Sequence, residues 1–486
     1  MIRIWTDGEI AGALDRLGKA GTSFAYKADA RAERAVSITM PHRVPSYDWS
    51  HGLVPIFEMN VPEGALRARL IRSFAKATGT FDDFDLLSIV GRSQLGRIRY
   101  SAMDGGLDEE TPFQSVDEIL RARRDGGLFD HLLDRFAQYS GLSGVQPKVM
   151  IRDEGKFSAG KARRSSSLRA ATHIVKLWDK DEYPELAANE YFCLLAAQKA
   201  GLDVPRFTLS DSGDALIIER FDLSDQGYLG VEDFCVLNGV GAAQKYAGSY
   251  ESRLFKRARD FIEPADHPRE MQALYRLFVL NCALRNGDAH LKNFALTYDR
   301  VDGPSRLAPV YDLVTTRAYL PEDSMALTLE GSTCWPDAKR LMRLGQLRAE
   351  LSPASVTQIF EATADAMSDA WKPAAAYFAN CTEPGVGERM KSAWEDGMAE
   401  ALGLVRSPGR ASPGPSPRRM MPRARSQAVV LERLRAEGGT ITGTLGSIAA
   451  RLSLPASTLS GALRVLEGRG LIVRDSRSVR LTDRDV

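Results

Sequence analysis

The sequence predicts an α+β protein of two lobes, followed by a small helix-turn-helix domain with a two-stranded wing. Three observations lead to this fold class. Three β-prone runs precede residue 222, a long amphipathic helical pattern follows it, and a Pro- and Arg-rich stretch then separates a strongly basic last segment. With 486 residues the chain is too long for one core, so we expect two to four domains.

Charge is distributed unevenly along the chain. The net charge is +1, but residues 404–486 carry 15 Arg, no Lys and six acidic residues, so this segment has a charge of +9 and the remainder −8. A basic segment of this kind indicates a nucleic-acid partner for the C-terminal part alone. The five Cys are widely spaced and form no C-x-x-C pair, which argues against a zinc or redox centre.

The start of the chain does not resemble a secretory signal. Residues 1–5 lack a basic start followed by an apolar stretch, and no apolar run in the chain approaches the ~18 residues of a membrane span. We therefore expect a cytoplasmic protein that does not bind a membrane.

The predicted domain boundaries follow the changes in composition. We expect an N-terminal subdomain at 1–102, a main core at 103–403 whose small lobe ends near 222, a linker at 404–426 and a C-terminal domain at 427–486. The linker holds five Pro among Gly, Ser and Arg, a composition that cannot bury apolar surface.

A loop of small residues precedes the first predicted strand of the main core. Residues 141–148 combine glycines, a hydroxyl and a lysine, which allows backbone N–H groups to approach phosphate oxygens. The loop matches neither standard phosphate-binding pattern, and taken alone it is better explained as the ordinary start of a hairpin.

The β-prone run 172–178 carries a lysine on an apolar face. Strand alternation places Ile174 and Lys176 on the same side, where a buried ammonium needs an anionic partner such as a nucleotide phosphate. An exposed strand end is the alternative explanation of Lys176. The helix expected after this strand offers Glu190 or Glu185 as a pairing partner.

The run 215–222 is typical of a buried strand with a polar exit. Kinases connect their two lobes through such a segment, which presents backbone groups to adenine.

The most informative residues follow the amphipathic helix, which we expect to end at Asn286-Gly287. Asp288 comes next, Asn293 follows five residues later, and Asp312 lies after a predicted β-hairpin. In protein kinases a catalytic Asp accepts the proton of the substrate hydroxyl, an Asn five residues later holds Mg²⁺, and a further Asp binds metal at the phosphates. Capping roles explain each Asp singly but not the ordered set. We therefore expect an ATP- and Mg²⁺-dependent kinase that phosphorylates a hydroxyl group.

Taken together, six segments resemble the HipA family of bacterial serine/threonine kinases. They are Ser143–Lys148, Thr172–Leu177, Asn189–Tyr191, Glu219–Asp222, Asn286–Phe294 and Val310–Asp312. Residues 53–57 and 61–64 also resemble the first subdomain of that family, so the resemblance covers roughly residues 1–400 in the right order. It implies a bilobal protein-kinase-like fold of HipA type.

The resemblance also implies roles for individual residues. Asp288 is the expected catalytic base, and Asn293 and Asp312 are the expected Mg²⁺ ligands. Lys176 is expected at the phosphates, and the backbone of Glu219 and Phe221 at adenine. The remaining expected nucleotide contacts are Ser143, Gly144, Val145, Gln146, Lys148, His290, Lys292 and Tyr311, together with the two metal ligands.

HipA-type proteins are toxins of toxin–antitoxin systems that phosphorylate a protein target, typically an aminoacyl-tRNA synthetase, and silence themselves by autophosphorylation. The resemblance therefore implies such a target and a HipB-like antitoxin as partners. In many members the modified serine lies two residues before Ser143, where this sequence has Gly141. Self-phosphorylation then uses Ser143 or Ser140, or is absent. Whether the chain forms a homodimer stays open.

The segment from residue 427 resembles winged helix-turn-helix regulators. Two short helical patterns flank a turn at Ser453-Leu454-Pro455, and a hairpin follows at 471–481. Winged helices also dock proteins or form dimers, which is the alternative to DNA binding. The candidate DNA contacts are Ser457, Thr458, Ser460, Arg464, Arg474, Arg477 and Arg480.

Two other functions compete with an active toxin kinase whose fused DNA-binding domain regulates its own gene. One is a DNA-binding regulator whose kinase fold senses a nucleotide or binds a partner. The other is a small-molecule kinase, because a fold does not fix the acceptor.

Overall fold

The computed structural model describes residues 1–74, 82–107, 110–122, 127–144, 146–153, 170–178, 183–224, 227–381 and 383–403, and short stretches between 430 and 481. The chain divides into two compact units. The first comprises Met1–Thr315 and Ser324–Leu404, and the second Thr316–Asp323 and Val405–Val486. Helices and sheets both contribute to the first unit, which confirms the expected mixture of α and β structure.

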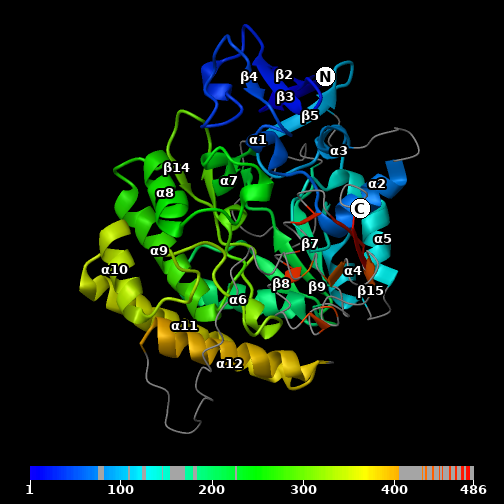
Figure 1. Ribbon diagram of the computed structural model, residues 1–486. Helices are drawn as coiled ribbons and strands as arrows, with labels where there is room; N and C mark the ends of the chain where they lie inside the picture. Colours follow the sequence, from blue (N-terminus) through cyan, green and yellow to red (C-terminus); the bar gives the residue numbers. More distant parts are fainter. Residues whose placement is uncertain are drawn as a thin grey trace. The chain divides into compact units, whose positions relative to one another are not determined.

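An antiparallel sheet of strand order β4-β3-β2-β1-β5 forms the N-terminal part of the first unit (blue in Figure 1). Alternation along β1 buries Ile2 and Ile4 on one face. These residues belong to a hydrophobic core that also contains Val149, Val175 and Ile217 of the next sheet. The elements of this part are β1 Ile2–Thr6, β2 Glu9–Leu17, β3 Gly21–Tyr26, β4 Tyr47–Trp49, β5 Ile98–Ala102, α1 Pro55–Glu58, α2 Gly64–Phe74 and α3 Asp83–Val90.

A second antiparallel sheet of order β6-β7-β9-β8 carries the predicted strands around Val149, Lys176 and Ile217. All five residues of β7 are buried, so Lys176 lies inside the fold and not at an exposed strand end. The strands are β6 Lys148–Ile151, β7 His173–Leu177, β8 Phe207–Leu209 and β9 Ala215–Glu219, and the nearby helices are α4 Val116–Arg121, α5 Gly127–Phe136 and α6 Leu186–Lys199.

Helices dominate the rest of the first unit, where α11 packs on α6 and α12 on α9 (Figure 1). Trp394 of α12 is fully buried against the Trp371 ring of α11, and its Nε1 donates to the Thr315 hydroxyl at 2.7 Å. The elements are the sheet β12 Gly230–Asp233, β13 Ala295–Tyr298, β14 Ser305–Leu307, the hairpin β10 Leu223–Ser224 and β11 Gly227–Tyr228, and the helices α7 Phe234–Leu237, α8 Lys256–Phe261, α9 His267–Leu284, α10 Ala338–Arg348, α11 Pro353–Phe378 and α12 Pro384–Ala401.

The end of α9 differs from the expected cap at Asn286-Gly287. The helix ends at Leu284, and Arg285 takes the left-handed conformation with φ 58°. That conformation is unusual for a residue with a side chain. The guanidinium of Arg285 is buried, donates to the Asp396 carbonyl at 3.0 Å and pairs with Glu400, so contacts to α12 hold the cap in place. Long-range contacts of this kind leave no local signal in the sequence.

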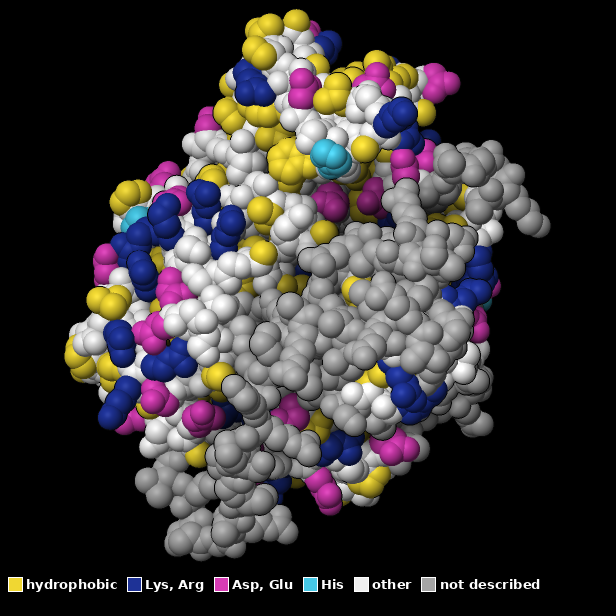
Figure 2. All heavy atoms as spheres, viewed as in Figure 1, with side chains coloured by type: hydrophobic (Ala, Val, Ile, Leu, Met, Phe, Trp, Pro, Cys, Tyr) yellow, Lys and Arg dark blue, Asp and Glu magenta, His cyan; other side chains and the backbone are white. Residues whose placement is uncertain are grey.

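The surface of the helical region carries mixed charge. Figure 2 shows Lys and Arg side chains gathered over α8 and α10, interspersed with Asp and Glu. Pairs such as Lys256–Asp260 at 3.4 Å are exposed and contribute little to stability. In the part of the chain that the structure describes, no helix combines the length and apolar character needed to cross a membrane.

The second unit contains an antiparallel sheet of order β15-β17-β16, with strands β15 Thr440–Thr442, β16 Ile472–Asp475 and β17 Ser478–Leu481. Buried Leu434, Leu459 and Val479 belong to a hydrophobic core of its own. The hairpin of β16 and β17 coincides with the predicted wing, whereas the winged helix-turn-helix fold as a whole stays a prediction. Among the candidate DNA contacts, Ser457, Thr458, Arg464 and Arg477 lie outside the described residues.

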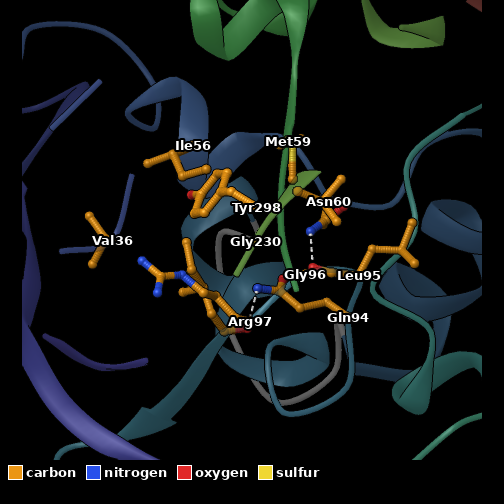
Figure 3. A pocket seen from close by; sticks show the side chains of 12 residues that line it. Val36, Ile56, Met59, Asn60, Gln94, Leu95, Gly96, Arg97, Gly230 and Tyr298 are labelled. Carbon is orange, nitrogen blue, oxygen red and sulfur yellow. Dashed lines mark hydrogen bonds between the residues drawn. The ribbon is translucent and has the colours of Figure 1, made fainter. Parts of the chain in front are cut away.

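A small cavity lies where the N-terminal sheet meets β12 and β13 (Figure 3). Asn60 closes one side by donating to the Leu95 carbonyl at 2.9 Å. Gly230 lies against the Tyr298 ring, which is 2.2 Å from where a Cβ would be. The volume of about 10 Å³ holds no more than one water, so the cavity is a packing feature and not a ligand site.

Beside this cavity, Glu232 of β12 joins the two parts of the first unit through buried hydrogen bonds. Its carboxylate accepts from the Ser37 hydroxyl and the Ile38 N–H, both at 2.8 Å, and from the Tyr298 hydroxyl. Burial raises the pKa of Glu232 to about 7. The folded protein therefore holds a proton on Glu232 in a pH range where an unfolded chain has released it.

The pKa of Glu232 predicts a falling stability between about pH 4.5, the ordinary value, and pH 7. The folded state binds more protons at Glu232 than the unfolded state in this window. The contribution of Glu232 to stability is therefore fully present below pH 4.5 and is lost as pH rises towards 7, by at most about 1.4 kcal/mol per pH unit. Glu232→Gln should flatten this decline in urea unfolding measured from pH 5 to 8. Glu388→Gln, at an exposed position of α12, serves as the control, and an unchanged slope in Glu232→Gln would contradict the assignment.

Candidate active site

Lys176 lies at the centre of the candidate site, on β7, one of the two inner strands of the second sheet. Its Nζ pairs with Glu190 Oε1 of α6 at 2.6 Å and with Asp312 Oδ1. Burial disfavours the charged ammonium, but Asp312 and Glu190 outweigh it and raise the pKa of Lys176. Of the two carboxylates predicted as partners, Glu190 is confirmed, since Glu185 instead accepts from the Tyr377 hydroxyl at 2.7 Å.

The loop after α9 carries Asp288 and Asn293, which are joined by a hydrogen bond. Asn286 Oδ1 accepts from the Asp288 N–H at 3.1 Å, and Asn293 Nδ2 donates to the Asp288 carbonyl at 2.8 Å. These bonds fix the backbone of Asp288 while its side chain stays 48% exposed. The amide orientation of Asn293 directs Nδ2 to the loop and leaves Oδ1 as a possible cation ligand.

Asp312 comes from the segment after β14 and takes the left-handed conformation with φ 51°. Besides Lys176, its carboxylate faces Lys148 Nζ at 4.0 Å. Burial alone would raise the pKa of Asp312, but Lys148 and Lys176 hold it well below its ordinary range. A left-handed Asp costs backbone energy, and such residues cluster at functional sites.

The loop before β6 folds back over Lys148. Gly144 has φ 108°, and a Cβ built there would lie 2.6 Å from Lys148 Nζ. Gln146 Nε2 donates to the Leu177 carbonyl at 3.4 Å, which ties the loop to the end of β7. Val145 lies outside the described residues. The positive φ therefore favours glycine at this position, and a side chain there would displace the Lys148 ammonium.

The two candidate serines have different surroundings. Ser140 is fully buried, and its hydroxyl donates to the Phe136 carbonyl and accepts from the Met150 N–H, each at 2.8 Å. Ser143 is half-buried and donates to Glu63 Oε1 at 3.3 Å. Ser140 is thus part of the packing, and Ser143 faces the site.

Glu63 belongs to the site although no motif assigned it a role. Its carboxylate lies 3.3 Å from Lys292 Nζ and 3.6 Å from Lys245 Nζ. Burial would raise the pKa of Glu63, but Lys292 and Lys245 lower it to about 2. The Val61–Gly64 segment resembled the family, yet nothing in one sequence indicates that it contacts a lysine more than 180 residues away.

The segment that we expected to connect two lobes follows β9. The rings of Phe221 and Tyr311 stack with centroids 5.9 Å apart and 17° between their planes. Fully buried Arg220 and Asp222 form an ion pair at 2.6 Å and bind the N-terminal part through the Gln94 carbonyl and the Gly96 N–H. These contacts fix Arg220 and Asp222 directly after Glu219, in the segment that we expected to bind adenine.

His290 lies beside the candidate base. Its Nε2 is 4.0 Å from Asp288 Oδ2, and burial lowers the pKa of the imidazole to about 4. Its buried Nδ1 has no hydrogen-bond partner among the residues that the structure describes. The ring is neutral at pH 7, and its orphaned nitrogen is available to a ligand.

The residues fit a magnesium nucleotide. Asn293 Oδ1 and the Asp312 carboxylate are hard oxygen ligands of the kind that Mg²⁺ prefers, and Lys148, Lys176 and Lys292 supply positive charge for phosphates. Within the described ranges, no group of three or more His, Cys, Asp or Glu could hold a metal by itself. Mg²⁺ bound with substrate phosphates needs only one or two protein ligands.

Comparison with known proteins identifies the family. Profiles of the HipA N-terminal domain and the HipA-like C-terminal domain match residues 2–101 and 140–371. "Putative kinase Y4mE" of Sinorhizobium fredii is 30% identical over 345 residues, which are 66% of this chain and 78% of that protein. The chain belongs to the HipA family.

Two further similarities support the HipA assignment. "Putative kinase Y4dM" of Sinorhizobium fredii is 30% identical over 290 residues, or 56% of this chain and just under two thirds, 65%, of that protein. A chain in the solved Shewanella oneidensis MR-1 complex of HipA, HipB and operator DNA matches with a TM-score of 0.61 and 20% identity, covering 83% of this chain and 98% of that chain. The latter match shows a shared fold.

Gly144 provides a test of the loop. Gly144→Ala should weaken binding of ADP with Mg²⁺ about tenfold in calorimetric titration, since the new Cβ collides with Lys148 and strains the left-handed backbone. Gly331→Ala, at an exposed glycine with φ 78° and open space around it, carries similar backbone strain and should keep the wild-type affinity. Equal affinities of all three proteins would show that the loop does not contact the nucleotide.

Proposed function

We propose that this HipA-family protein is an ATP- and Mg²⁺-dependent serine/threonine protein kinase that acts as the toxin of a toxin–antitoxin system. One cluster carries the proposal: buried Lys176 between Glu190 and Asp312, with Asp288 and Asn293 on the adjoining loop. Protein kinases use these residue types in these roles. Two relatives at 30% identity bear names that describe them as kinases, which supports the same activity.

The proposed roles follow from the surroundings of each side chain. Asp288 is exposed enough to meet an acceptor and takes the proton of its hydroxyl group. Glu190 keeps Lys176 charged and aimed at the phosphates. Bound ATP and Mg²⁺ supply the phosphoryl group and offset its charge, with Asn293 and Asp312 holding the metal.

The adenine base is proposed to bind the backbone of Glu219 and Phe221 next to the aromatic pair. Neutral His290 and the 143–148 loop line the phosphate side. The protein acceptor that the family resemblance suggests is an aminoacyl-tRNA synthetase. Ser143, which faces the site, is the better candidate for autophosphorylation than buried Ser140.

Replacing Asp288 tests the proposed activity. Asp288→Asn keeps the shape of the side chain but removes the base, so phosphate transfer to the chain or to proteins of a cell extract should fall at least ~100-fold. Intact-mass spectrometry after incubation with ATP and Mg²⁺ measures the transfer. Asp302→Asn, at an exposed surface pair with Arg300, is the matched control and should match the wild type.

Other results of this experiment favour the competing functions. ATP binding by the wild type without any transfer would favour a DNA-binding regulator that uses nucleotide as a ligand. Phosphate found on small molecules of the extract, and not on proteins, would indicate a small-molecule kinase.

We propose further that the second unit binds operator DNA as a winged helix-turn-helix domain, and that a HipB-like antitoxin is a partner. The segment 404–486 has a charge of +9, and its described strands form a sheet with a β-hairpin and a separate core. The solved Shewanella oneidensis complex contains HipB and operator DNA beside HipA. Autoregulation of the toxin gene by the same chain follows from such a fusion.

The DNA proposal predicts a steep salt dependence. Binding of the full chain to its own promoter DNA should weaken linearly on a log–log plot against salt, because each neutralised phosphate releases counterions. Arg480→Ala, at an exposed position of β17, should lower the slope by about 1, whereas Arg300→Ala on the first unit should leave it unchanged. A flat curve, or no binding, would favour a protein-docking role.

A further inference from the structure

Tyr246 contacts the proposed base from a segment that no motif singled out. Its hydroxyl donates to Asp288 Oδ1 at 2.6 Å. Its ring meets that of His290 edge-on, with centroids 5.0 Å apart. Among the residues that the structure describes, Tyr246 is the sole hydrogen-bond partner of the Asp288 carboxylate, because the other hydrogen bonds of Asp288 involve its backbone.

A general base has to keep one oxygen directed at the acceptor hydroxyl. Asp288 is half exposed, so without a partner its carboxylate would rotate freely in water. A bond to Oδ1 fixes that rotation and leaves Oδ2 for the incoming hydroxyl. A displacement of about 1 Å at such a group can cost ~100-fold in rate.

We propose that Tyr246 is the positioning residue of the catalytic carboxylate, holding Asp288 Oδ1 so that Oδ2 accepts the proton of the acceptor. The inference rests on the proposed kinase function and deepens it. It assigns to the phenol a role in the chemical step and none in nucleotide binding.

The N-terminal part of the protein holds the Tyr246 segment in place. Glu58 Oε2 accepts from the Ala242 N–H at 2.9 Å, and a Cβ on Gly241 would lie 2.8 Å from the same oxygen. The Lys245 carbonyl accepts from the Leu291 N–H at 3.1 Å, and its Nζ faces Glu63. Glu58 and Glu63 of the HipA N-terminal domain thus hold the segment 241–246, whose Tyr246 in turn holds the Asp288 carboxylate.

The same hydrogen bond fits an alternative role for Tyr246, in which its phenol occupies the acceptor position and is itself phosphorylated. The two readings differ in outcome. A positioning residue stays unmodified and sets the rate for another acceptor, whereas an internal acceptor gains phosphate.

The test uses the full chain, ATP with Mg²⁺, and the acceptor identified by the mass experiment. Tyr246→Phe keeps the ring but removes the bond to Asp288, so kcat should fall ~10- to 100-fold while KM for ATP stays within about twofold. Tyr275→Phe, whose hydroxyl binds the Leu341 carbonyl at 2.8 Å in the helical region, removes a buried tyrosine hydrogen bond elsewhere and should keep kcat. Glu58→Ala should lower kcat with the same signature, and Glu58→Gln, which retains an acceptor oxygen, should restore it.

Several outcomes would overturn the inference. An unchanged kcat in Tyr246→Phe, a rise in KM for ATP in place of the fall in kcat, or an equal loss in Tyr275→Phe would each show that the bond to Asp288 does not position the base. Phosphate mapped to Tyr246 would show an acceptor. Failure of the kinase proposal itself is distinct, because the wild-type protein would then transfer no phosphate.

Discussion

The architecture of the site depends on one buried charge. An ammonium inside a protein is costly unless opposite charges and hydrogen bonds surround it. Lys176 meets this requirement only because α6 brings Glu190 and the segment after β14 brings Asp312 to the same point of β7. The lysine therefore joins α6, β7 and the segment after β14 at one point. Without that pairing, buried Glu190 would carry an uncompensated desolvation cost.

The N-terminal HipA domain packs against the site and makes contacts that position it. Its sheet shares a hydrophobic core with the strands of the small lobe. Its loop at Gln94 and Gly96 binds the Arg220–Asp222 pair that follows β9. Its carboxylate Glu63 pairs with Lys292 on the loop after α9 and with Lys245. The boundary expected at residue 102 separates two family domains in sequence, but the contacts that position the site cross it.

Much of the fold and the centre of the site were predictable because their signals are local. Alternation along β7 placed Lys176 on a buried face, and the five-residue spacing from Asp288 to Asn293 pointed to one loop. Glu63 and Tyr246 were missed because each acts across long stretches of chain, and a single sequence contains no pattern that joins such positions. The predicted end of α9 was wrong for the same reason, because contacts from distant α12 hold Arg285 in its left-handed conformation.

The charges of the site also bear on how a nucleotide would enter. Lys176 is already paired with Asp312, and Lys292 with Glu63, so added phosphates would meet lysines whose charge is neutralised. Phosphates alone would also face the repulsion of both carboxylates. A divalent cation bound by Asp312 would remove the repulsion between this carboxylate and the phosphates. It would also replace Lys176 as the partner of Asp312, so that Lys176 could pair with a phosphate. Glu63 keeps a second cationic partner, Lys245 at 3.6 Å, when Lys292 turns to the phosphates. For the proposed nucleotide site, this charge balance favours a nucleotide that enters together with a divalent cation.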